Sequence, residues 1–139
     1  MSCMKQIIEI MDLIDHPEID GEAVKDFLTP FGVDNIDIIR LEGDEGKTDV
    51  VKVLIPGKSG AENGGDAPTL GIVGQLGGIG ARPEVLGLVS DADGAIVALA
   101  DAMKLATSAK RGDLLEGDVM ITTHVAPDAP TLPHDPVPF

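Results

Sequence analysis

The chain has 139 residues, of which 43% are hydrophobic and only 2% aromatic, with neither Trp nor Tyr. This length corresponds to one domain, and the aliphatic core that the composition requires favours a sheet covered by helices over an aromatic-rich β-sandwich. The formal net charge of −14 argues against nucleic acid and anionic membranes as partners, because clustered Lys and Arg bind both.

Cysteine content and hydropathy bear on the compartment. Cys3 is the single cysteine, so no internal disulfide can form. No apolar run approaches the roughly 20 residues that span a bilayer, and the first residues do not resemble a signal peptide. We therefore expect a cytoplasmic protein that does not enter membranes.

Two helices are expected first. Within residues 4–14, apolar side chains recur at three- and four-residue spacing, which predicts an amphipathic helix. Asp20 is a good N-cap residue, and it precedes a second helical pattern over residues 21–28.

Three strands and a long helix follow. Residues 35–41 and 47–55 read as strands, and the short turn between them predicts antiparallel pairing. The apolar run 70–76, bounded by glycines, is typical of a buried central strand. A helix is expected from Ala92 or Asp93 to about Ala109.

The last regular element expected is a strand over residues 119–125. The order of elements predicts an α/β fold, a mixed sheet of four to five strands flanked by helices, within residues 1–126. Residues 127–139 contain five prolines, which no regular element accommodates. An apolar, proline-rich end of this kind is expected to pack on a partner chain.

Polar residues stand at the ends of these elements. In an α/β fold such positions meet at one edge of the sheet, where ligands bind. Asp91 and Asp93 either cap the long helix or ligate a divalent metal. His124 is either a satisfied histidine at the sheet edge or a functional one.

The glycines that follow residues 70–76 allow a tight exit from the strand or a close approach by a ligand. Gly78-x-Gly80 lacks the third glycine of a dinucleotide fingerprint, and no Gly-Lys-Ser/Thr follows as in a phosphate loop. The run therefore indicates neither type of nucleotide site.

Several motifs resemble the zinc-dependent aminopeptidase and carboxypeptidase clan. The segment 73–80 looks like its Gly-His-x-Asp strand exit, and Asp91-Ala-Asp-Gly94 looks like its Asp-x-x-Gly motif, whose aspartate bridges two metals. The clan's metal-binding His is Gln75 here, and its partner Asp is Gly77. The clan's Glu-Glu pair, expected at about residues 126–128, is not kept, so Asp91 alone carries over as a ligand.

A more specific resemblance is to an uncharacterised prokaryotic family, domain of unknown function 1177. It rests on Gly112-Asp-Leu-Leu-Glu-Gly-Asp-Val119 and on the whole segment 122–139. Members look about twice as long, which implies that this chain is an N-terminal half with a phosphorylase/hydrolase-like core. The other half would be a second chain, made from a second gene or by cleavage after Phe139.

Two functions remain open. The first is a subunit or fragment of a peptidase-like or amide hydrolase acting on a small peptide or amino-acid derivative, completed by a second polypeptide in an oligomer and using zinc or a similar divalent metal. A metal-free variant is autoprocessing, which leaves an N-terminal nucleophile on the partner. The second is a catalytically degenerate binding or structural protein.

The candidate residues for this site fall into three groups. They are, as catalytic groups, Asp91, His124 and Asp128; as metal ligands, Asp91, Asp93 and His124; and, against the substrate, Gln75, Gly77 and Gly78.

Overall fold

The computed structural model describes residues 3–44, 46–75, 78–79, 88–90 and 92–126. Its centre is a mixed sheet in the order β1-β2-β6-β3. The strands are β1 (Ile36–Gly43), β2 (Gly46–Ile55), β6 (Val119–Val125) and β3 (Leu70–Val73). β2 is antiparallel to both β1 and β6, whereas β3 runs parallel to β6. The expected α/β fold with a mixed sheet is confirmed.

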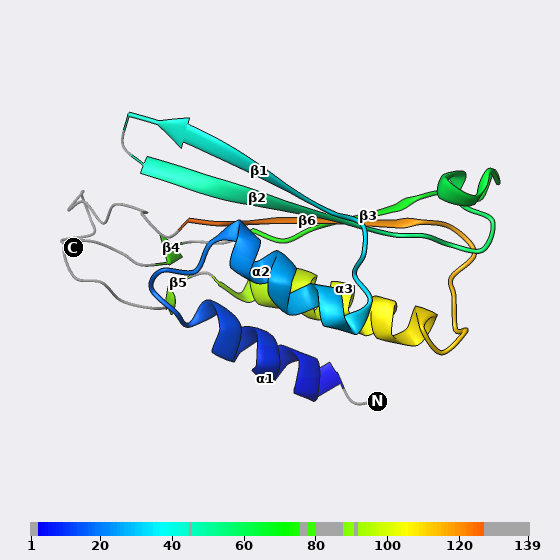
Figure 1. Ribbon diagram of the computed structural model, residues 1–139, viewed down its shortest axis with the longest axis horizontal. Helices are drawn as coiled ribbons and strands as arrows, with labels where there is room; N and C mark the ends of the chain where they lie inside the picture. Colours follow the sequence, from blue (N-terminus) through cyan, green and yellow to red (C-terminus); the bar gives the residue numbers. More distant parts are fainter. Residues whose placement is uncertain (1–2, 45, 76–77, 80–87, 91, 127–139) are drawn as a thin grey trace.

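The helices α1 (Cys3–Ile14), α2 (Gly21–Leu28) and α3 (Asp93–Ala109) lie on the same face of the sheet (Figure 1). Short 3-10 turns, η1 (Thr29–Phe31) and η2 (Ala61–Asn63), link elements. No helix within the described residues is long and apolar enough to cross a membrane.

The strand β4 (Gly78–Ile79) pairs antiparallel with β5 (Leu88–Ser90) as a separate two-stranded sheet. β5 precedes the start of α3 in the chain. These two short strands were not expected from the sequence, because glycines and small apolar residues there give no period-two pattern.

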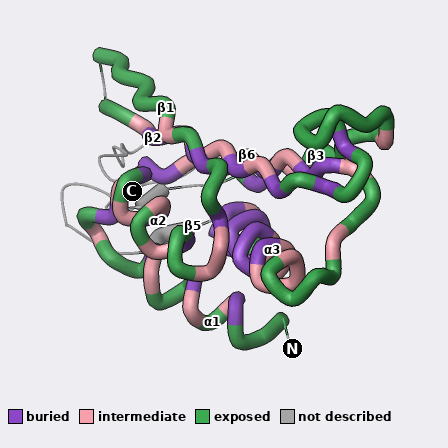
Figure 2. The backbone as a smooth tube through the Cα atoms, turned by 45° about the vertical axis from the view of Figure 1, so that its right-hand side comes forward, coloured by how far each residue is buried: buried purple, intermediate pink, exposed green. Residues whose placement is uncertain are grey.

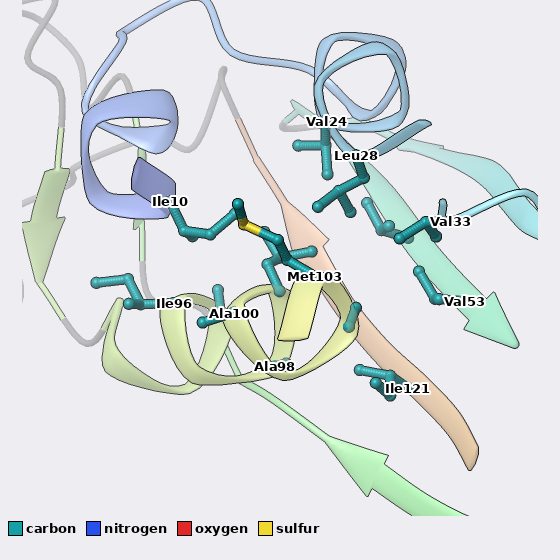
Figure 3. Packing of buried hydrophobic residues seen from close by; sticks show 14 of the residues in the cluster. Ile10, Val24, Leu28, Val33, Val53, Ile96, Ala98, Ala100, Met103 and Ile121 are labelled. Atoms are coloured by element: carbon teal, nitrogen blue, oxygen red, sulfur yellow. The ribbon is translucent and has the colours of Figure 1, made fainter. Parts of the chain in front are cut away.

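The core fills the space between the sheet and α3. Ile10 of α1 and Leu28 of α2 are fully buried together with Met103 of α3, and Figure 3 shows them converging from the three helices. From the sheet, Val53 and Ile121 pack against the same cluster. Eight residues of α3 are buried, and they and alternate residues of β6 form the buried bands in Figure 2.

The other face of the sheet carries no helix among the described residues. We call it the open face; it comprises Asp37, Ile39 and Leu41 of β1, Thr48, Val50, Lys52 and Leu54 of β2, Met120, Thr122 and His124 of β6, and Gly71 and Val73 of β3. Ile39, Leu41 and Val73 are exposed there. The half-buried side chains of β2 and β6 alternate with fully buried ones that face the helices.

The sequence located most of these elements within a few residues. The second helix begins and ends at the expected residues, and Asp20 caps it by accepting from the Ala23 N–H at 2.9 Å. The antiparallel pairing of β1 with β2 is confirmed. The prediction of a buried central strand at 70–76 was wrong: β3 stops at Val73 and lies at the edge of the described sheet, with Leu70 and Val73 exposed.

Candidate functional site

The exit of β3 and the start of α3 touch, because both carry glycine. A Cβ on Gly74 would lie 2.1 Å from the carbonyl oxygen of Gly94, and a Cβ on Gly94 would lie 2.4 Å from the carbonyl oxygen of Gln75. Real Cβ atoms do not approach backbone this closely, so only glycine permits the contact. The sequence-predicted meeting of Gln75 with the first turn of α3 is therefore observed as backbone contact.

Asp93 is the first residue of α3 and is exposed to solvent. The N-cap position is Ala92, and no side chain of the described residues caps this end. Asp93 therefore does not act as an N-cap residue, and its carboxylate stabilises the helix through the macrodipole alone. This leaves the carboxylate available to another group.

His124 stands on β6, the strand beside β3, and its ring lies on the open face opposite Val50. Its Nδ1 lies 3.0 Å from the Thr48 Oγ1, and this hydroxyl donates to the Val125 carbonyl oxygen at 3.1 Å. A hydroxyl has one proton, so when the carbonyl takes it, His124 Nδ1 must be the donor to Thr48. Neutral His124 then carries its proton on Nδ1 and keeps a lone pair on Nε2.

His16 shows the opposite arrangement. The backbone N–H of Glu18 donates to His16 Nδ1 at 3.3 Å, so neutral His16 carries its proton on Nε2. The two histidines therefore present different nitrogens to their surroundings. Of these two described histidines, His124 is the one that presents Nε2 as an acceptor, the nitrogen that a metal ion or a substrate proton would meet.

The three predicted groups share one end of the sheet but not one face of it. Gln75 contacts the first turn of α3 through its backbone, and Asp93 begins that helix, whereas the ring of His124 emerges on the open face. A ligand that touched all three would have to lie across the end of the sheet. Gly78 belongs to β4, while Gly77, Asp91 and Asp128 fall outside the described residues.

A metal site requires several ligand side chains close to one another. Within the residues that the structure describes, no three His, Cys, Asp or Glu side chains come together as a cation site. Catalytic zinc needs three protein ligands, and the described residues offer His124 and Asp93 without a third. The fit to a metal is therefore incomplete on this part of the chain.

Two other carboxylates are buried and engaged in the fold. Asp49 receives the Arg40 guanidinium through two bonds of 2.7 Å and the Gly21 N–H at 2.8 Å. Hydrogen bonding by Arg40 holds the pKa of Asp49 below its usual value, although burial opposes this. Because these contacts tie the start of α2 to the sheet, Asp49 has a structural role.

Asp118 plays a similar part at the opposite end of β6. It accepts from the Gly57 N–H at 2.8 Å and from the Glu62 N–H at 3.2 Å, which fixes the loop around η2. These backbone bonds, the one from Gly57 first, lower the pKa of the Asp118 carboxyl. Asp118 is buried and its acceptors are occupied, so it is not free for catalysis.

A hollow of about 330 Å³ lies at this opposite end, between the end of β2 and the last turn of α3. Its polar lining includes Lys110 and Asn63, whose side chains bind the carbonyl oxygens of Pro30 at 3.0 Å and Gly57 at 2.7 Å. Because the Lys110 and Asn63 side chains already donate to backbone carbonyl oxygens, the hollow is a weak candidate for specific binding.

Thr48 was missed by the sequence reasoning. It becomes relevant only because the register of β2 with β6 sets Val50 opposite His124, two residues along from Thr48. A single sequence shows that two strands exist but not their register, so no signal in the chain pointed to this pair.

These features define an α/β protein with a mixed sheet covered by helices on one face and polar groups at one end. The family model for "Protein of unknown function (DUF1177)" matches residues 39–139. The chain therefore belongs to that family, as its motifs indicated. No curated protein matches the chain.

Two solved structures are similar at low identity. One, described as bottromycin maturation enzyme BotP, is 16% identical with a TM-score of 0.43. The other, leucyl aminopeptidase from Leishmania major in complex with actinonin, is 15% identical with a TM-score of 0.47. They match 96% and 94% of this chain, which spans 32% and 29% of their lengths.

Proposed function

We propose that the chain is one part of a peptidase-like or amide hydrolase, acting on a small peptide or amino-acid derivative and completed by a second polypeptide. The observation that supports this proposal most is the position of His124 and its contact with Thr48. Thr48 contacts Nδ1 of the ring and also donates to the Val125 carbonyl oxygen, and this arrangement favours the tautomer that leaves a lone pair on Nε2. Histidines that act as bases or metal ligands are held in this way.

In this proposal the residues of this chain bind and orient. Without a metal, Nε2 of His124 takes a proton from water or from a nucleophile while Nδ1 stays bound to Thr48. With a metal bound, Nε2 is a ligand instead, and a carboxylate such as Asp128 takes the proton. The exposed Gln75 and the backbone at Gly77 and Gly78 contact the substrate where β3 ends. Asp91 and Asp128 are the carboxylates proposed to take part in catalysis.

A divalent metal such as zinc, when bound, would polarise the scissile carbonyl and lower the pKa of water. His124, Asp91 and Asp93 are the residues of this chain proposed to hold it. Because His124 and Asp93 are too few for a zinc site, further ligands must come from Asp91 or from the second polypeptide.

The test begins with the native assembly. Intact mass under native and denaturing conditions, together with metal analysis, shows whether an equimolar second chain and a metal are present. Hydrolysis of aminoacyl amides and dipeptides by that assembly is then compared between wild type, Asp91→Ala and His124→Ala. We expect both variants to lose activity and keep their fold, while His16→Ala stays active.

A second candidate function is favoured by a separate observation. Gln75 and Gly77 stand where the peptidase clan has a metal-binding His and its partner Asp, and the described residues contain no three-ligand group. A catalytically degenerate protein that binds a small ligand or serves as a structural partner has this appearance. Such a protein would hold no stoichiometric metal and hydrolyse no amide.

The autoprocessing variant has its own readout. If cleavage of a longer precursor produces the second chain, that chain begins with a Ser, Thr or Cys able to act as nucleophile. N-terminal sequencing of the partner decides this point.

A further inference from the structure

The two edges of the sheet differ in their protection. Natural edge strands carry charges, prolines or bulges that prevent another strand from pairing. β1 carries Asp37, Arg40 and Glu42. β3 has the sequence Leu-Gly-Ile-Val, with no charge and no proline. The β1 edge therefore carries charged residues of the kind that prevent pairing with another strand, whereas the β3 edge carries none.

The backbone of β3 has one satisfied side. The Leu70 N–H donates to the Asp118 carbonyl oxygen at 2.9 Å, and the Gly74 N–H donates to that of Thr122 at 2.8 Å. Alternate residues of a strand direct their N–H and C=O groups to opposite sides. Gly71 and Val73 therefore direct theirs away from β6, where no strand among the described residues pairs with them.

The side chains of β3 resemble those of an interior strand on both faces. Val73 lies on the open face and is 82% exposed, and Leu70 lies on the helix face and is 55% exposed. Apolar residues exposed on both faces of one strand are typical of a surface that another element covers. The apolar character of this segment is also the reason why the sequence predicted a central strand here.

We propose that the free edge of β3 pairs with a strand of the second polypeptide, which extends the sheet. This inference rests on the proposed function, because that function supplies the second chain. The partner strand is uncharged and rich in aliphatic residues, as β3 is, and the chain that carries it is less acidic than this one. Its end would lie beside Gln75, where it could add groups to the site.

A second copy of this chain fits the edge less well. Two copies would bring together net charges of −14 each. Homodimerisation is therefore a competing outcome of the test.

The experiment uses the second chain recovered from the native assembly, separated and mixed again with the isolated chain. Residue-resolved amide hydrogen exchange is measured before and after mixing. We expect the amides of Gly71 and Val73 to slow by about tenfold or more, as amides do when they enter a ladder. The amides of Leu70 and Gly74 already bind β6, so their exchange should change less.

Substitution at one residue provides a matched pair. A Cβ on Gly71 meets nothing within 4 Å, so side chains are tolerated there. Gly71→Pro removes the outward N–H without touching the bonds to β6 and should weaken binding of the second chain about tenfold. Gly71→Ala keeps the N–H and should bind like wild type. Val73→Lys, a charge on the exposed edge, should weaken binding as well.

Three results would overturn the proposal. One is a stable assembly of the two chains in which Gly71 and Val73 exchange as before; the proposed function then survives and the contact lies elsewhere. A second is protection of these amides in a homodimer, which assigns the edge to a second copy. The third is a chain that purifies alone as a monomer, which removes the second polypeptide itself. Failure of amide hydrolysis by an intact two-chain assembly counts against the proposed function only.

Discussion

The polar groups of this molecule form two sets with opposite surroundings. Asp49 and Asp118 are buried, and each accepts two or more hydrogen bonds from groups that hold a helix or a loop. Asp93 and Gln75, at the end of the sheet, are exposed. The difference separates carboxylates committed to the fold from groups available for chemistry, a distinction that residue type alone does not make.

The largest expected effect on stability is at Asp49, one of the two carboxylates that hold the fold together. Asp49→Ala removes the acceptor of Arg40 and of the Gly21 N–H at a position that is 1% exposed. We expect the free energy of unfolding to fall by about 3 kcal/mol, measured by urea denaturation. The control is Asp37→Ala, which breaks an exposed pair with Lys52 of 3.7 Å and should cost less than about 1 kcal/mol. Equal losses would contradict the division.

Acid should reduce the stability that Asp49 and Asp118 contribute to the folded protein. The pKa values of Asp49 and Asp118 are lowered in the folded protein, so on acidification the unfolded chain binds protons first. Their stabilisation is complete above about pH 5 and is lost as pH falls below about 4 through the folded pKa values. Burial raises the pKa of Asp101, which offsets part of this loss.

Thermal unfolding followed from neutral to acidic pH measures this dependence. The Tm of the wild type should drop on acidification, and that of Asp49→Ala should drop less, because one of the two groups is gone. Parallel curves for the two proteins would show that Asp49 does not contribute to the acid sensitivity.

The contact between the start of α3 and the residues after β3 should not tolerate a side chain at Gly94. Gly94→Ala places a Cβ against the Gln75 backbone, at 2.4 Å from its carbonyl oxygen. Ala is favoured over Gly in helices by about 1 kcal/mol, but the clash costs more. We expect a net loss of about 1–2 kcal/mol in chemical denaturation. Gly71→Ala, in open space, should cost nothing, and a stabilised Gly94→Ala would refute the contact.

The smallest expected effect on stability is at His124. Nitrogen-15 NMR of the imidazoles should show the proton on Nδ1 for neutral His124 and on Nε2 for neutral His16. Thr48→Val should shift His124 toward the Nε2–H form and leave His16 unchanged. The free energy of unfolding should change by about 1 kcal/mol or less. An Nε2–H form of His124 in the wild type would exclude the proposed role of its lone pair.

The sequence was informative where local chemistry decides structure. Asp20 as the cap of α2, the apolar stripe of α1 and the short turn between β1 and β2 each follow from neighbouring residues. Asp91, Asp93 and His124 were selected by their positions at the ends of elements, and this reasoning places His124 and Asp93 at one end of the sheet.

What the sequence did not predict depends on contacts between distant residues. The pairing of Thr48 with His124 joins residues 76 positions apart and requires the register of β2 with β6. The burial of Asp49 depends on Arg40 across the β1–β2 pair and on the start of α2. The edge position of β3 could not be predicted, because an apolar run reads the same with one neighbour as with two.

The open face also affects how the isolated chain behaves as a colloid. Ile39 and Leu41 stand in water on a protein whose formal charge is −14, so repulsion between copies opposes contact between these faces. That repulsion reaches about 30 Å at 0.01 M salt but only about 8 Å at 0.15 M. Ionic strength therefore sets the concentration at which the chain begins to self-associate. Low salt favours monomers, whereas added salt screens the repulsion and allows the open faces of two copies to make contact.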